Sequence, residues 1–247
     1  MNKKSCVKTF GVLLAGLMFM ASMNTCVYAA SVYLVGISDT GHDHMSCYDT
    51  ITPYLEKMGY SSGEIYKRED LVLADVMSML DVGEIIVTRS HGGAFTDSSG
   101  NYIGNFICLS DKNLCNSDIE DLVNGSLSNA KLIVYGGCLT AAGGVSSTSI
   151  RNLTVASEVK GASTVVGFTE EVNCAGANTW VKFFFQHLSE GDNIDESLNE
   201  AMKETQKKHF ILQALGELGN QSCMYRGLWN TTINYEVDRK SKRLNSS

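Results

Sequence analysis

Apolar runs alternate with amphipathic stretches along most of the chain. Continuous apolar runs of strand length lie at residues 31–37, 84–88, 131–135 and 162–167, as expected for strands buried on both faces. A period near 3.6 residues predicts the helices, which cover residues 48–58, 71–80, 118–128, 149–160, 178–188 and 194–209. Residues 101–109 are predicted to pair as a hairpin arm with residues 94–96, and residues 228–237 are predicted to form a last strand.

The order of these elements predicts the fold class. Buried strands separated by helices indicate an α/β protein with a mostly parallel sheet covered by helices on both faces. The chain holds one proline and no low-complexity linker, which favours a single domain. Its 247 residues, 44% hydrophobic and 19% charged, are enough for one good core.

The charge pattern narrows the possible partners. The formal net charge is −7, and Lys and Arg are scattered rather than gathered in a stripe that would follow phosphates. Nucleic acid is therefore not expected as a partner.

The cysteines form no CxxC pair, so a zinc ribbon is not indicated, and we expect neither a cofactor nor a metal.

The N-terminus has the pattern of an export signal. Lys3, Lys4 and Lys8 form a basic start, an apolar stretch follows at residues 10–23, and small residues lie at the end of residues 27–29. The apolar stretch is shorter than the ~20 residues that a membrane-spanning helix needs. We predict a signal peptide at residues 1–29, a secreted domain at residues 30–238 with no membrane contact after cleavage, and a polar tail at residues 239–247.

Six of the eight cysteines remain after removal of such a signal. Export permits disulfides, and Cys108 and Cys115 flank a short polar loop that a disulfide can close, although spacing does not decide it. His42, His44 and Cys47 form a metal-like cluster, for which a solvated loop is the favoured interpretation. A metal-dependent hydrolase that uses these three residues stays as an alternative.

Two predicted strands end in residues that can do chemistry together. The strand at residues 131–135 runs into two glycines and then Cys138, and the strand at residues 84–88 runs into a loop with His91. Carboxyl ends of parallel strands gather at one rim, so a thiol and an imidazole meet there if the strands are neighbours. The histidine can supply a base to a thiol whose free pKa is near ~8.5. The glycines allow close backbone approach and leave N–H groups for an oxyanion.

A strand that ends in His-Gly, followed ~50 residues later by a strand that ends in a small residue and Cys, resembles the pattern of caspase-like (clan CD) cysteine peptidases. Here Cys138 follows His91 by 47 positions. Residues 31–205 look most like the bacterial gingipain and clostripain relatives and the CHAT-like domains. Residues 161–167 and 183–202 are similar to the next strand and helices of that family.

The resemblance implies a three-layer caspase-like fold and a cysteine endopeptidase that acts on a peptide or protein through a thioester. Cys138 would be the nucleophile, and His91 would protonate the leaving amine. The N–H groups of Gly92 and Cys138 would hold the oxyanion. A catalytically silent binding module on the same fold stays open as an alternative, and so does the oligomeric state.

The sequence departs from some relatives at the position that sets specificity. Relatives that cut after basic residues carry an acid two positions before the cysteine, where this chain has Gly136. Asp39, just after the first strand, is on the correct rim and is the candidate substrate-binding acid. Asp97, Glu170 and Glu171 are equally reachable.

Overall fold

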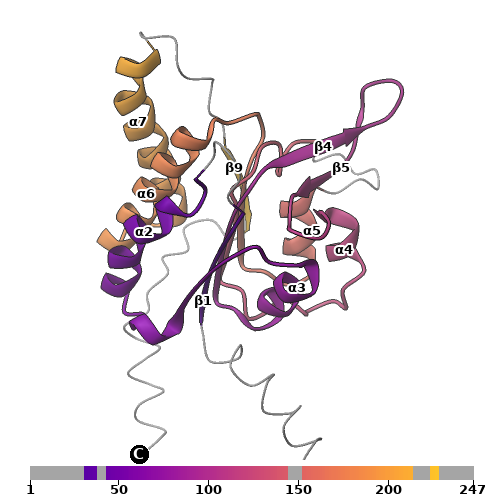
Figure 1. The fold of residues 1–247 in the computed structure, drawn as a ribbon, viewed down its shortest axis with the longest axis horizontal. Helices are drawn as coiled ribbons and strands as arrows, with labels where there is room; N and C mark the ends of the chain where they lie inside the picture. Colours follow the sequence, from indigo (N-terminus) through magenta and orange to yellow (C-terminus); the bar gives the residue numbers. More distant parts are fainter. Residues whose placement is uncertain (1–30, 38–42, 144–151, 214–222, 228–247) are drawn as a thin grey trace, which may run out of the picture. The chain divides into compact units, whose positions relative to one another are not determined.

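The structure is a computed structural model that describes residues 31–37, 43–143, 152–213 and 223–227, all within one compact unit (Figure 1). The predicted signal peptide and polar tail, the predicted strand at residues 228–237, and the side chains of Asp39 and His42 lie outside the described residues.

A six-stranded sheet forms the centre of the fold. Its strand order is β2-β1-β3-β7-β8-β9, in which the first five strands are parallel and β9 runs antiparallel to β8. The strands are β1 (Val32–Gly36), β2 (Ile65–Glu69), β3 (Ile85–Arg89), β7 (Leu132–Tyr135), β8 (Thr164–Phe168) and β9 (Cys223–Gly227). The four predicted strands and the mostly parallel sheet are confirmed. The apolar pattern missed β2, because this edge strand has the polar sequence IYKRE and is largely exposed.

Helices cover both faces of the sheet (Figure 1). One face carries α2 (Ser46–Lys57), α6 (Cys174–Glu190) and α7 (Ile194–Gln213), and the other carries α3 (Leu73–Val82), α4 (Asn116–Glu120) and α5 (Leu153–Val159). Trp180 of α6 stacks on Phe184 of the same helix. It also contacts Phe168 of β8 edge to face, and this contact packs α6 against the sheet. No helix in the described ranges is long and apolar enough to cross a bilayer.

The helix predicted at residues 118–128 is wrong in extent. Helix α4 ends at Glu120, and turns follow it. The chain turns at Asn124 and Gly125, where Gly125 has a φ of 86°, a left-handed conformation that does not continue a helix. The other predicted helices are confirmed with shifted ends, apart from residues 149–151, which the structure does not describe.

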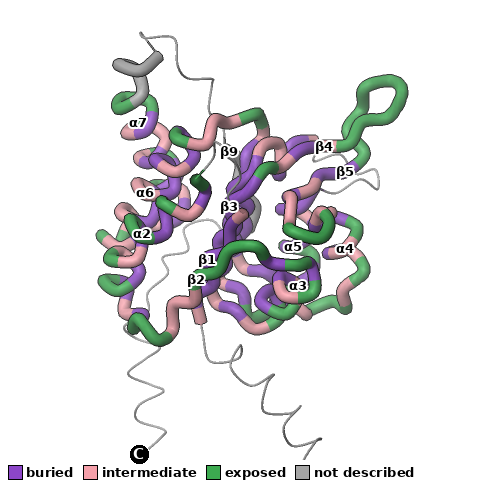
Figure 2. Tube along the Cα trace, viewed as in Figure 1, coloured by how far each residue is buried: buried purple, intermediate pink, exposed green. Residues whose placement is uncertain are grey.

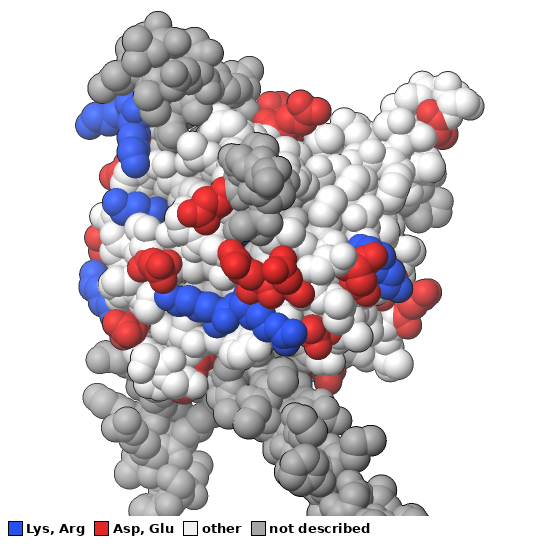
Figure 3. All heavy atoms as spheres, viewed as in Figure 1, with Lys and Arg blue, Asp and Glu red and all other residues white. Residues whose placement is uncertain are grey.

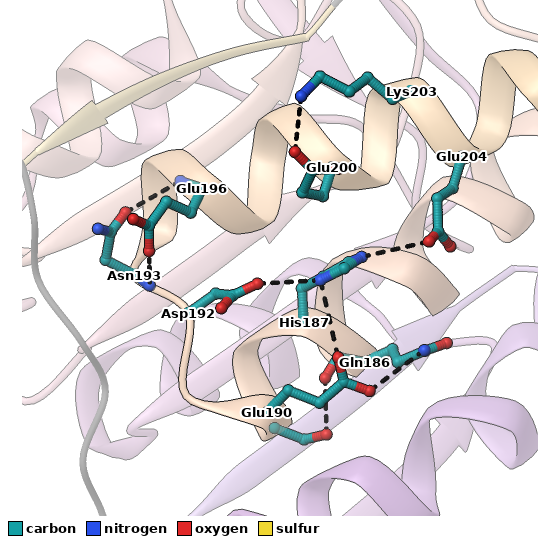
Figure 4. A network of polar contacts seen from close by, with 10 residues as sticks. Gln186, His187, Glu190, Asp192, Asn193, Glu196, Glu200, Lys203 and Glu204 are labelled. Carbon is teal, nitrogen blue, oxygen red and sulfur yellow. Dashed lines mark hydrogen bonds and ion pairs between the residues drawn. The ribbon is translucent and has the colours of Figure 1, made fainter.

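The junction between α6 and α7 is held by polar contacts (Figure 4). Nδ1 of His187 lies 3.0 Å from Oδ2 of Asp192, and its Nε2 lies 3.7 Å from Oε1 of Glu204 on α7. Gly191 ends α6 with a φ of 101°. These contacts fix the turn by which α7 returns along α6.

A second, three-stranded sheet follows β3. Strands β4 (Gly92–Thr96), β5 (Tyr102–Ile107) and β6 (Leu114–Cys115) pair antiparallel, and this confirms the predicted hairpin arm. The tip of the hairpin is exposed, whereas the strands of the main sheet are mostly buried (Figure 2). Strand β4 begins directly after His91, so the base of this hairpin lies at the rim of the main sheet.

Candidate active site

A cavity of about 120 Å³ lies where β3 and β7 end. The two strands are neighbours in parallel register, so the loops that follow them emerge side by side. The side chains that line the cavity include His44, Arg89, His91, Cys138, Val172 and Cys174. The structure thus brings the two residues predicted to act together, Cys138 and His91, to one cavity.

Cys138 is half-buried at the mouth of the cavity. Its Sγ lies 3.3 Å from both the backbone nitrogen and the carbonyl oxygen of Val172, and the Val172 N–H donates to the sulfur. Val172 belongs to the loop between β8 and α6. The loops after β7 and β8 therefore fix the position of the thiol between them.

The turn after Cys138 is tightly held. Leu139 has a φ of 58°, a conformation that non-glycine residues rarely adopt. The buried Thr140 hydroxyl lies 2.8 Å from the carbonyl oxygen of Tyr135 and 3.0 Å from that of Gly137, and it accepts the N–H of Phe168 at 3.2 Å. These bonds maintain the sharp turn that presents Cys138 at the end of β7.

Two glycines bring the loops into backbone contact. A Cβ on Gly92 would lie 2.6 Å from the carbonyl oxygen and 3.0 Å from the nitrogen of Cys138. A Cβ on Gly137 would lie 3.0 Å from the nitrogen of Gly92. Real Cβ atoms do not approach backbone this closely, so only glycine fits at Gly92 without a shift of the chain. The backbone of Gly92 consequently lies directly beside that of Cys138.

Two histidines face the same cavity. His91 is exposed, and its ring meets the buried ring of His44 edge to face at a centroid distance of 5.3 Å. Nδ1 of His44 lies 3.4 Å from Sγ of Cys174, the first residue of α6. A second imidazole and thiol pair therefore lines the cavity that holds Cys138 and His91.

The metal-like cluster takes a different form from the sequence pattern. Cys47 is buried in α2, and its Sγ donates to the backbone carbonyl of His44 at 3.4 Å, so the thiol does not lie beside the imidazole in a shared set of ligands. Within the described ranges, no three His, Cys, Asp or Glu side chains are grouped as metal ligands. Burial raises the pKa of the Cys47 thiol to about 11, against the opposing charge of Arg89.

Arg89, the last residue of β3, is 1% exposed. Its Nε and Nη2 both donate to Oδ1 of Asn178, at 3.0 and 2.8 Å. Nη2 also lies 3.4 Å from the carbonyl oxygen of Cys174. Nη1 donates to the carbonyl oxygen of Gly136. All of these acceptors are uncharged. The guanidinium links the end of β3 to the loop before Cys138 and to the first turn of α6.

The acidic candidates differ in their position. Glu171 lines a wider groove of about 460 Å³ beside the cavity, together with Gly92 and Cys138. Glu170 meets the cysteine loop through its backbone, whose carbonyl accepts the Leu139 N–H. Asp97 lies in the exposed hairpin turn, where hydrogen bonds from Asn101, then from Ser99, hold the pKa of its carboxyl below the usual value. The Asp97 carboxylate therefore stabilises the hairpin turn.

The disulfide considered between Cys108 and Cys115 is not formed, because both thiols are free. The register of the second sheet explains this result. Cys115 on β6 lies opposite Phe106 on β5, so Cys108 falls beyond the end of the paired residues. The two cysteines do not face each other across the ladder.

Sequence reasoning missed several residues that line the cavity. Arg89 lies two residues before His91, but the apolar residues of its strand gave no sign that the arginine side chain points inward. Val172 and Cys174 follow β8, whose carboxyl end lies at the same rim as those of β3 and β7. The predicted strand at residues 162–167 was the available signal, because the loop after a parallel strand emerges at the same rim as those after its neighbours.

A parallel sheet that presents a histidine and a cysteine from adjacent strands defines the class of caspase-like cysteine peptidase folds. Residues 67–214 match the CHAT domain family, and since this is more than half of the chain, the protein belongs to that family.

Two solved structures of gingipain share this fold at low identity. The Arg-specific cysteine proteinase gingipain R (RgpB) superposes with a TM-score of 0.51 at 13% identity, over 74% of this chain and 43% of that one. A complex of the pro- and mature domains of RgpB from Porphyromonas gingivalis gives 0.54 at 11% identity, over 85% and 49%. Separase from Saccharomyces cerevisiae, solved with securin, gives 0.49 at 12% identity, over 81% and 12%. The chain thus spans less than half the length of these proteins, and no curated protein sequence matches it.

Proposed function

We propose that this protein is a cysteine endopeptidase that hydrolyses peptide bonds with Cys138 and His91. One observation carries the proposal: the thiol and the imidazole line one cavity at the ends of neighbouring strands, with the backbone of Gly92 against Cys138. Membership of the CHAT domain family and the caspase-like fold support it.

In the proposed reaction, the Cys138 thiol gives its proton to His91, and the sulfur attacks the carbonyl carbon of the scissile peptide bond. The oxyanion that forms accepts hydrogen bonds from the N–H groups of Gly92 and Cys138. As the carbon–nitrogen bond breaks, His91 gives a proton to the leaving amine and a thioester remains on Cys138. Water then attacks the thioester, His91 takes the proton from water, and the carboxylic acid product and the thiol are released.

The substrate side of the proposal uses the groove beside Cys138. A groove of about 460 Å³ between the start of β4 and the loop after β8 has room for an extended peptide. The partner is therefore a peptide or protein. Asp39 stays a sequence prediction for substrate binding, because it lies outside the described residues.

The surface charge supports a protein partner over a nucleic acid. Lys and Arg are interspersed with Asp and Glu on the face shown in Figure 3. Both basic residues on β2 are paired: Lys67 lies 2.8 Å from Asp49, and Arg68 lies 3.4 Å from Asp75. A phosphate backbone would need an unbroken basic track instead.

The proposed site of action is outside the cytoplasm, after removal of a signal peptide. The basic start, the apolar stretch and the small-residue site at the N-terminus support this part of the proposal. N-terminal sequencing of protein recovered from the medium or cell surface tests it, and the expected first residue is Ala30. Recovery of the chain only from the cytoplasm, with Met1 intact, would refute export.

A positional-scanning peptide library, incubated with the chain and with Cys138→Ala, tests the activity. Peptide hydrolysis by the native chain and none by Cys138→Ala is the expected result. Cys108→Ala is the matched control, because it removes another half-buried thiol that does not line the cavity. A catalytically silent module would show no hydrolysis, and a thiol-directed inhibitor would label Cys138 no faster than the other thiols.

A further inference from the structure

Two thiols line the cavity at the ends of β3 and β7, and the proposed reaction uses only one of them. Cys138 and Cys174 are both half-buried there, and both carry reduced thiols. The cavity of about 120 Å³ gives the two sulfur atoms access to the same small space. Cys174 is therefore placed to react with a group that forms on Cys138.

The backbone between the two cysteines places them within reach of a disulfide. Sγ of Cys138 lies 3.3 Å from the nitrogen and from the carbonyl oxygen of Val172. Cys174 follows Val172 by two residues, and two residues span at most ~7 Å of extended chain. This reach is comparable to the ~4.4–6.8 Å between the Cα atoms of a disulfide. Residues 171–173 form neither helix nor strand, so a small shift of this loop suffices for the bond.

The surroundings of Cys174 favour reaction at its sulfur. Nδ1 of the buried His44 lies 3.4 Å from Sγ of Cys174, and the tautomer that leaves Nδ1 unprotonated can accept the thiol proton. Nη2 of Arg89 lies 3.9 Å from the same sulfur. Cys174 is also the first residue of the 17-residue helix α6, at the positive end of its dipole. A base and nearby positive charge make a thiol a nucleophile.

A third thiol in this region, that of Cys47, is shielded from reaction. Its side chain is 3% exposed, and its Sγ donates to the carbonyl oxygen of His44 at 3.4 Å. Burial raises the pKa of the Cys47 thiol to about 11, against the opposing charge of Arg89. Cys47 therefore stays protonated, and an oxidant in the cavity reaches Cys138 and Cys174 instead.

We infer that Cys138 and Cys174 form a reversible disulfide when a peroxide oxidises Cys138, and that this disulfide switches off the proposed peptidase. The disulfide itself depends only on the two thiols and their surroundings. Its effect on hydrolysis rests on the proposed function, because the sulfur that would attack the peptide bond is then bonded to Cys174.

The oxidation takes place in two steps. The Cys138 thiol gives its proton to His91, and its sulfur attacks one oxygen of hydrogen peroxide. The oxygen–oxygen bond breaks, the hydroxide takes the proton from His91 and leaves as water, and a sulfenic acid remains on Cys138. Cys174 then gives its proton to His44, and its sulfur attacks the sulfur of the sulfenic acid. The sulfur–oxygen bond breaks, and the second hydroxide takes that proton and leaves as water. Two thiols are oxidised, and one peroxide is reduced to two waters.

The first test detects the disulfide. The chain is treated with hydrogen peroxide, the remaining thiols are blocked with iodoacetamide, and unreduced peptides are mapped by mass spectrometry. A linkage between Cys138 and Cys174 is expected, and dithiothreitol should remove it. Cys174→Ser should instead accumulate sulfinic acid on Cys138, because the sulfenic acid has no thiol to react with in the cavity. Cys108→Ser is the matched control and should keep the linkage, since Cys108 is half-buried but does not line the cavity.

The second test measures hydrolysis of one peptide, with each protein compared with its own untreated sample. Peroxide should lower the activity of the native chain and of Cys108→Ser about 10-fold or more, and dithiothreitol should restore it. Cys174→Ser should also lose activity but regain little of it, because thiols do not reduce a sulfinic acid. Thermal melts show whether each variant folds. If Cys174→Ser does not fold, the linkage map of the native chain decides.

The outcomes separate the inference from the function. Absence of the Cys138–Cys174 linkage in the oxidised native chain, or a linkage of Cys174 to Cys47 instead, overturns the inference and leaves the peptidase intact. Recovery of a folded Cys174→Ser that equals that of the native chain also overturns it, and so does full hydrolysis by the linked protein. If the linkage forms but the untreated chain hydrolyses no peptide, the disulfide stands, and the proposed function fails together with its switch.

Discussion

Gly92 and Gly137 lie backbone against backbone: a Cβ built on Gly137 would be 3.0 Å from the Cα of Gly92. One glycine follows His91 and the other precedes Cys138, so this contact joins the two loops that carry the proposed reacting groups. No side chain separates them. The distance between the two loops is thus set by glycine at both positions.

Gly92→Val is expected to lower turnover by about 10²–10³-fold while the protein remains folded. A Cβ at this position would meet the carbonyl oxygen of Cys138 at 2.6 Å, so the loop must move and take the Gly92 N–H away from the oxyanion. Steady-state kinetics beside a thermal melt make the measurement.

Two other glycines serve as controls. Gly63→Ala adds a Cβ where no atom lies within 4 Å, and should change neither turnover nor stability. Gly93→Ala would meet Cζ of Phe106 at 2.5 Å, a ring that can move, so a milder effect on rate is expected. Full turnover in Gly92→Val, or a loss that follows unfolding alone, would remove the loop backbone from the proposed machinery.

His91→Ala is expected to reduce kcat by roughly 10²–10⁴-fold, because the leaving amine loses its proton donor. The exposed position of His91 means that the melting temperature should stay close to that of the native protein. The informative comparison is His44→Ala, since the two rings are in contact. Unchanged kcat in His91→Ala together with a large loss in His44→Ala would transfer the role of general acid to His44.

Thr140→Val should destabilise the protein by about 1–3 kcal/mol and lower activity. Valine has nearly the shape of threonine but cannot donate to the carbonyls of Tyr135 and Gly137 or accept the N–H of Phe168, and all of these groups would stay buried. Urea unfolding gives the free energy. Thr140→Ser keeps the hydroxyl and should lose less stability, and equal losses for valine and serine would show that packing, rather than hydrogen bonding, holds the cysteine turn.

Cys47 should make folding sensitive to alkaline pH. Its pKa is raised from 9.0 to about 11 by burial, so its contribution to stability is complete below pH 9 and is lost as the pH rises through 11. The free energy of unfolding of Cys47→Ala should therefore fall less between pH 8 and pH 10.5 than that of the native protein, by on the order of 1 kcal/mol. Tyrosines also titrate in this range, so the difference between the two proteins is the quantity to compare. Identical pH profiles would contradict a buried, protonated thiol.

The strands that carry the site could be predicted from the sequence alone. Residues 84–88 and 131–135 are short apolar runs, and the loops that follow them contain His91 and Cys138. A strand that is buried on both faces needs such a continuous apolar run. The helices could also be predicted, because a helix that buries one face repeats its apolar residues about every 3.6 positions. Local pattern also predicted that the thiol and the imidazole would be found at strand ends.

The tertiary structure decided which side chains share the cavity. Strand β2 and the loop after β8 gave little local signal, because an exposed edge strand has no apolar run and a loop has no periodicity. The inward direction of Arg89, the contact of His44 with Cys174, and the contact of Gly92 with Gly137 all join segments far apart in the chain. Such contacts depend on the order of the strands and on packing between loops, which the pattern of apolar and polar positions along the chain does not encode.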